Sequence, residues 1–120
     1  FPIRLALLAT SPACGGGVWS IAMPRETSAS IAAWGAETFG EVNDLAVLIQ
    51  RARAEFEELS AAARAGDADE IGAEAADVMI LLHRLLGILG KDLAEEVDAK
   101  MNINRNRQWR LSGDGVGQHE

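Results

Sequence analysis

The sequence predicts an all-α domain, organised as a four-helix bundle of the kind that two or more chains complete together. Between Ser28 and Arg107 the chain is rich in Ala, Leu, Glu and Arg, all of which favour helices. Apolar residues in this region recur at steps of three and four, and no segment alternates apolar and polar residues as a half-buried strand does. The 120 residues are enough for one domain with one hydrophobic core.

Charge and cysteine content exclude several classes of partner. The formal net charge is −7, so the chain is a poor candidate for binding a nucleic-acid polymer or an anionic membrane surface. No apolar run approaches the roughly 20 residues that span a membrane. The single cysteine, Cys14, excludes an internal disulfide and is compatible with the reducing cytoplasm, where we expect the protein to work.

Residues 1–22 differ from the rest of the chain. They hold two of the three prolines, a run of three glycines and one charged residue, Arg4. We expect them to be an extension outside the functional domain, with residues 23–110 forming the helical domain. A secretory signal peptide is the alternative, but the apolar run at residues 5–9 is short and no clean cleavage site follows it.

The first two helices are predicted over residues 28–39 and 42–65. Ser28 or Ser30 caps the first helix, and a glycine ends it. Trp34 on this helix either packs in the core or offers a surface on which a nucleobase stacks. On the second helix, Glu55 lies on the buried apolar stripe and Glu58 flanks it, and a carboxylate that faces a core is costly unless something compensates its charge.

The third helix is predicted over residues 68–89, with a capping box formed by Asp67 and Glu70. Its second half is apolar nearly all round, so it must be covered on every side. Four short helices from one chain provide too little cover, and we therefore predict a homodimer or a dimer of dimers, which is a homotetramer. His83 in this stretch is either a packed or interface residue, or a ligand or base.

The fourth helix is predicted over residues 93–107, and a glycine-rich tail over 111–120. One face of this helix starts apolar and ends with Lys100, Asn104 and Arg107. Cations on a core-directed face need an anionic partner, either an acidic residue of a neighbouring helix or the phosphates of a ligand. The tail is expected to be mobile, or to fold over a site.

Two acidic pairs mark the centre of the chain. Glu55 and Glu58 are followed by fifteen residues and then by Glu74 and Asp77. Each pair has i, i+3 spacing and projects from one side of its helix, and antiparallel packing of the two helices brings all four carboxylates together. Four such charges take up protons or share a cation. Ligands that are all oxygen suit Mg²⁺ or Mn²⁺.

The acidic pairs, with the Lys100-Met101-x-x-Asn104-x-x-Arg107 pattern, resemble the motifs of the MazG-type, all-α nucleoside triphosphate pyrophosphohydrolases. The likeness covers about residues 28–109. It implies Mg²⁺-dependent cleavage of a nucleoside triphosphate to a monophosphate and pyrophosphate, as part of nucleotide-pool housekeeping. The implied metal ligands are Glu55, Glu58, Glu74 and Asp77, and the implied phosphate-binding residues are Lys100, Asn104 and Arg107. Many relatives have a glutamate where this chain has Ala54, which puts an additional carboxylate in doubt.

Glu58 is the candidate catalytic base, because a flanking carboxylate that is not fully used in coordination can take the proton of the attacking water. Two alternatives remain open. One is a non-catalytic helical dimer that acts as a scaffold or regulatory partner. The other is a related pyrophosphohydrolase that acts on phosphoribosyl-ATP or on a deoxynucleoside diphosphate. No feature of the sequence selects the base or sugar, although Trp34 and Trp109 are candidate base contacts.

Overall fold

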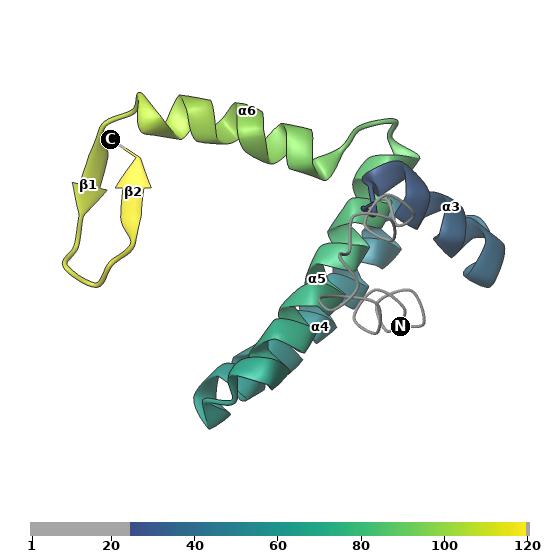
Figure 1. The fold of residues 1–120 in the computed structure, drawn as a ribbon, viewed down its shortest axis with the longest axis horizontal. Helices are drawn as coiled ribbons and strands as arrows, with labels where there is room; N and C mark the ends of the chain where they lie inside the picture. The colour runs from purple at the N-terminus through teal and green to yellow at the C-terminus, as the bar shows by residue number, and fades with distance from the viewer. Residues whose placement is uncertain (1–24, 120) are drawn as a thin grey trace, which may run out of the picture.

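The computed structural model describes residues 25–119, which form four helices followed by a β-hairpin (Figure 1). The helices are α3 (Ser28–Phe39), α4 (Leu45–Ala65), α5 (Ala68–Ile88) and α6 (Leu93–Arg105), and the strands are β1 (Trp109–Leu111) and β2 (Gly117–His119). The mostly helical fold is as predicted. The antiparallel hairpin, in which Trp109 lies opposite His119, corrects the expectation that the chain contains no strand. The predicted extension, residues 1–22 with Cys14, lies outside the described residues.

Helices α4 and α5 form a long antiparallel pair at the centre of the fold (Figure 1). Gly66 ends α4 in the left-handed conformation, with φ of 79°, which a side chain would disfavour. Asp67 then caps α5 by accepting hydrogen bonds from the backbone N–H groups of Asp69 and Glu70. The apolar residues buried in this pair are Leu48, Ala52 and Ala62 on α4 and Val78 on α5.

Helix α3 packs closely on the last turns of α5. A methyl group at Gly87 would lie 2.2 Å from the backbone oxygen of Ser28, so only glycine allows this approach. The cap of α3 differs from the prediction. Thr27, rather than Ser28 or Ser30, is the N-cap, and its hydroxyl accepts from the Ser30 N–H while the Ser30 side chain accepts from the Thr27 N–H.

A buried polar network joins the starts of α3 and α6. The fully buried Ser28 donates its backbone N–H to Asp92 at 3.1 Å, and its hydroxyl accepts from the Leu93 N–H at 2.8 Å. Asp92 also accepts from the Glu95 N–H, so one carboxylate caps two helices. The hydrogen bond from the Ser28 N–H is the main cause that holds the pKa of Asp92 below its usual range. The hydroxyl oxygen of Ser28 lies 2.8 Å from Nδ1 of His83. His83, which is half-buried, is therefore a packed residue that shares a hydrogen bond with the Ser28 hydroxyl.

Helix α6 leaves this junction and runs away from the α4–α5 pair, and the hairpin continues beyond its far end (Figure 1). We call residues 93–119, which comprise α6 and the hairpin, the arm. The radius of gyration is 17.7 Å, against about 13 Å for a compact domain of about 100 residues. Large apolar side chains are exposed on all four helices, and those on α4, α5 and α6 are Val47, Ile49, Phe56, Met79, Ile88, Val97, Met101 and Ile103.

Three helix boundaries differ slightly from the predictions. Asp44 caps α4, accepting from the Ala46 N–H at 3.0 Å, so the helix begins at residue 45 rather than 42. Helix α5 ends at residue 88 rather than 89. Helix α6 ends at Arg105, so Arg107 lies beyond the helical face to which the sequence assigned it. Within the described residues, none of the helices combines the length and the apolarity that crossing a bilayer requires.

Candidate active site

The two acidic pairs come together on the α4–α5 pair. Carboxylate oxygens of Glu55, Glu58 and Glu74 lie within 4.8 Å of one another. Asp77 is close enough that its charge raises the pKa of both Glu55 and Glu74. Glu55 is buried and Glu74 half-buried, whereas Glu58 and Asp77 are exposed. These four residues, called the acid cluster below, therefore have a closed side and a side open to solvent.

Burial and the repulsion of neighbouring carboxylates make Glu55 and Glu74 hard to ionise. Burial raises the pKa of Glu55 above its ordinary value of 4.5, and the charges of Glu58 and Asp77 raise it further. Arg51, whose Nη2 lies 3.3 Å from Oε1 of Glu55, acts in the opposite direction without cancelling the effect. The pKa of Glu74 is raised for the same reasons, with burial again the largest. A bound cation would favour the ionised form of all four carboxylates.

The donor set fits a divalent cation that prefers oxygen. Oε2 of Glu74 is buried and, within residues 25–119, has no hydrogen-bond partner. The 4.8 Å spread of the carboxylate oxygens is only slightly wider than the roughly 4.2 Å between opposite ligands of an octahedral Mg²⁺. The cluster contains neither sulfur nor imidazole, which argues against zinc. Glu55, Glu58 and Glu74, with Asp77 beside them, are the residues that would hold Mg²⁺ or Mn²⁺.

The residues predicted to bind phosphates lie on the arm, which diverges from the acid cluster of its own chain (Figure 1). Lys100 is exposed. Arg107 lies 2.7 Å from Nε2 of His119, and its guanidinium carbon is 5.8 Å from the centre of the Trp109 ring. The Trp109 indole donates to the carbonyl of Asn104 at 3.0 Å, and Oδ1 of Asn104 is buried without a partner among the described residues. The cationic end of α6 is thus built together with the hairpin, and one chain does not bring it to the acids.

A cavity of about 630 Å³ lies between the α3–α4 loop and α5, and Phe39, Arg51 and Arg84 contribute to its wall. Arg51 also contacts Glu55 of the acid cluster, so the cavity and the cluster are neighbours. Trp34, the predicted base contact, is 52% exposed and does not itself line this cavity. It packs edge-on against Phe39, with the ring centres 5.4 Å apart.

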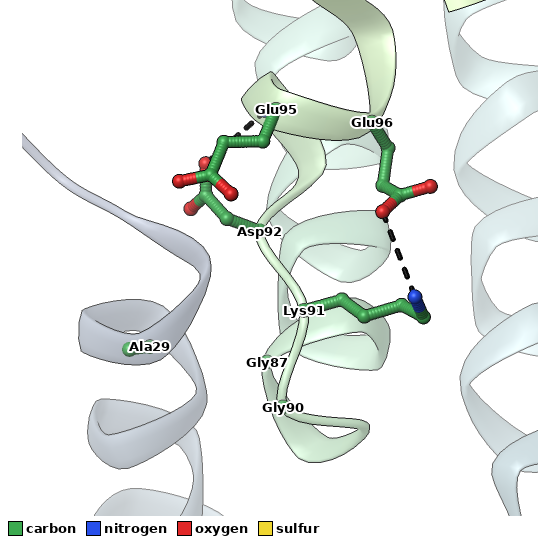
Figure 2. Close-up of a pocket in the computed structure, with 7 residues that line it drawn as sticks. All are labelled: Ala29, Gly87, Gly90, Lys91, Asp92, Glu95 and Glu96. Atoms are coloured by element: carbon green, nitrogen blue, oxygen red, sulfur yellow. Dashed lines mark hydrogen bonds and ion pairs between the residues drawn. The ribbon is translucent and has the colours of Figure 1, made fainter. Parts of the chain in front are cut away.

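A second hollow, of about 440 Å³, lies at the turn between α5 and α6 (Figure 2). Three carboxylates line it, those of Asp92, Glu95 and Glu96, and Lys91 is the one cation in its wall. Nζ of Lys91 lies 3.7 Å from Oε2 of Glu96, which leaves an excess of negative charge. This hollow would repel a triphosphate and is not a candidate for the substrate site.

Comparison with known proteins identifies the family. Residues 27–119, which include the acid cluster and the whole arm, match the dATP/dGTP pyrophosphohydrolase family. The chain belongs to this family. A "dATP/dGTP diphosphohydrolase" of Cyanophage S-2L is 42% identical over 65 residues, which are 54% of this chain and 58% of that protein. The chain thus spans less than two thirds of the length of this curated relative. No solved structure matches the chain at a significant level.

The family assignment confirms the resemblance to MazG-type pyrophosphohydrolases, and it shows that the hairpin belongs to the family domain. Sequence reasoning missed the cavity and the role of Arg84 in its wall. A signal was present: Arg84 interrupts an apolar stretch of helix seven residues after Asp77, and therefore lies on nearly the same helical face. The roles of the acid cluster, the arm and Trp34 stay predictions.

Proposed function

We propose that this protein is a Mg²⁺-dependent pyrophosphohydrolase that cleaves purine deoxynucleoside triphosphates, dATP and dGTP, to the monophosphate and pyrophosphate. The family and the name of the phage relative support both the reaction and the substrate class. The observation that carries the proposal is the acid cluster, in which three carboxylates meet and the buried Oε2 of Glu74 has no hydrogen-bond donor among residues 25–119. Mn²⁺ is the alternative cation.

The reaction adds water and breaks the bridging P–O bond between the α and β phosphates. Mg²⁺ held by the acid cluster would neutralise charge on the triphosphate. Glu58, on the open side of the cluster, would accept the proton of the attacking water. Burial keeps Glu55 and Glu74 in position, because surrounding side chains restrict their rotamers. Lys100, Asn104 and Arg107 would bind the phosphates and stabilise the leaving pyrophosphate.

We propose that these three residues come from a second copy of the chain. The arm of one chain points away from its own acid cluster, and exposed apolar residues on α4, α5 and α6 offer surface that a second copy would bury. The charges are complementary at the far part of the arm, because residues 99–113 carry Lys100, Arg105, Arg107 and Arg110 and no acidic residue, whereas the cluster carries four carboxylates. A homodimer, or a homotetramer built from two such dimers, would then complete each site.

The first experiment measures release of pyrophosphate from the four deoxynucleoside triphosphates with and without Mg²⁺. Glu74→Gln removes one charge from the cluster and should lower kcat/KM by more than about 100-fold. This is more than the loss typical when a residue that only supports a metal ligand is replaced, because Glu74 would bind the metal itself. Glu57→Gln, an exposed neighbour of Glu58 outside the cluster, is the matched control and should retain wild-type rates. Normal turnover by the Glu74→Gln variant would refute the metal site.

A second experiment tests the shared site. Glu74→Gln and Lys100→Ala variants, each inactive alone, are unfolded, mixed in equal amounts and refolded together. If the arm acts on the partner's cluster, half of the dimers are mixed and each has one intact site, so about one quarter of the wild-type activity should return. If each arm served its own chain, every mixed dimer would also hold two defective sites, and no activity would return.

A further inference from the structure

The cavity beside the acid cluster contains a buried cation that has no counter-ion in the part of the chain that the structure describes. Arg84 is 9% exposed, and its Nη2 donates to the carbonyl of Gly40 at 2.9 Å. Among residues 25–119, its Nε has no hydrogen-bond partner and no carboxylate forms an ion pair with it. A guanidinium has five N–H donors, and a buried charge with most of its donors unused is costly. Because Arg84 lines the cavity and only Nη2 has a partner among the described residues, its terminal nitrogens have donors available for an acceptor on a ligand.

The position of Arg84 is restricted from two sides. Its side chain crosses the backbone of Gly35, where a methyl group would lie 2.4 Å from Nε, and only glycine leaves room for the guanidinium. Phe39, the last residue of α3, is on the same helix as Gly35. The centre of its ring lies 5.7 Å from the guanidinium carbon of Arg84. A donor fixed in this way loses little freedom when it binds a ligand.

The cavity lies at a suitable distance from the acid cluster. Leu48 in the cavity wall precedes Glu55 by seven residues on α4, and Arg84 follows Asp77 by seven residues on α5. Seven residues advance a helix by about 10.5 Å and return to nearly the same face. The cavity is therefore about two helical turns from the cluster, and Arg51, which contacts both, lies between them. The sugar and the phosphates of an extended nucleotide can together bridge this distance.

We propose that this cavity binds the purine base of the nucleotide whose phosphates lie at the acid cluster, and that Arg84 donates a hydrogen bond to N7 of the base. The assignment rests on the proposed function. N7 is the acceptor that adenine and guanine share on the edge that carries their 6-substituent, and pyrimidines have no equivalent atom there. Phe39 and the apolar side chains of Val47 and Leu81 supply the walls against which a flat base packs.

The test compares dGTP and dATP with their 7-deaza analogues, in which a C–H group replaces N7. For the wild-type protein, KM should rise about 10-fold to 100-fold for each analogue while kcat stays nearly the same, as expected when a hydrogen bond to a charged group is lost. Arg84→Met should show the raised KM with the natural nucleotides and should no longer distinguish them from the analogues. Arg64→Met, an exposed cation at the far end of α4, is the control and should behave as wild type.

The outcomes separate this assignment from the proposed function. Equal KM values for natural and 7-deaza nucleotides in the wild-type protein would overturn the assignment and leave the hydrolase function standing. Discrimination that persists in Arg84→Met would overturn the role of Arg84. Absence of hydrolysis of any nucleotide by the wild-type protein would overturn the proposed function and the assignment with it. The wild-type comparison needs no variant, so it decides the question even if Arg84→Met does not fold.

Discussion

Replacing Gly87 by alanine tests the close packing of α3 on α5, which sets the direction of the arm. In an unhindered helix, alanine is more stable than glycine by about 1 kcal/mol. At Gly87 the added carbon would lie 2.2 Å from the Ser28 carbonyl oxygen and 2.6 Å from Cβ of Ala32. Both atoms belong to or adjoin the α3 backbone and cannot rotate aside, so the helices must separate. Overpacking costs about 1–3 kcal/mol, and displacement of Ser28 disrupts its buried hydrogen bonds, so we expect a net loss of about 2 kcal/mol.

Gly72, on the same helix, provides the matched control. A methyl group there meets no atom within 4 Å, so Gly72→Ala should stabilise the protein by up to about 1 kcal/mol. Urea denaturation followed by far-ultraviolet circular dichroism measures both changes, at one protein concentration because association contributes to stability. The two substitutions should shift the midpoint in opposite directions with unchanged m-values. A Gly87→Ala protein at least as stable as wild type would refute the packing of α3 on α5.

The remaining predictions concern the acid cluster and the junction of α3 with α6. Because the pKa values of Glu55 and Glu74 are raised, these two carboxyl groups in the metal-free protein contribute their full stability below pH 4.5, and the contribution is lost as the pH rises through their folded-state pKa values. Without Mg²⁺, the melting temperature of Glu74→Gln should therefore increase relative to that of wild type as the pH rises. A difference between the two melting temperatures that does not change with pH would contradict the pKa shifts. Mg²⁺ should raise the wild-type melting temperature more at higher pH, since protons compete for its ligands, and a shift that is independent of pH would argue against carboxylate binding. Ser28→Ala leaves the Leu93 N–H and His83 Nδ1 without a partner and should cost about 1–3 kcal/mol in urea denaturation, whereas Ser60→Ala on the exposed face of α4 should be nearly neutral.

The helices and the acid cluster could be predicted from local information in the chain. Capping residues and apolar spacing depend on neighbours within about one helical turn, so the bounds of α3 and α5 were close to those observed. The convergence of Glu55 and Glu58 on Glu74 could be predicted with one additional inference, that the short turn at Gly66 makes the two helices run antiparallel. Where a single tight turn connects two elements, spacing along the sequence specifies neighbours in space.

Contacts between distant segments could not be predicted in this way. The hairpin was missed because its strands have three residues each, too few for an alternating pattern, and it depends on Trp109 packing against His119 and Asn104. Ser28 was expected to cap a helix, and only the packing of α3 on α5 brings its hydroxyl to His83 and Leu93. These contacts join residues more than 50 positions apart, and no local preference encodes them.

The arm shows the same division most clearly. Lys100 and Arg107 could be recognised in the sequence as cations that need an anionic partner, but the direction of α6 is set by the hydrogen bonds of Asp92 to Ser28 and Glu95. That direction takes the cations away from the acids of their own chain (Figure 1). The chain thus encodes its helices and its charged motifs locally, because each depends on a few consecutive residues. Which motifs meet depends on how helices from distant parts of the chain pack, and that is decided only in the folded structure.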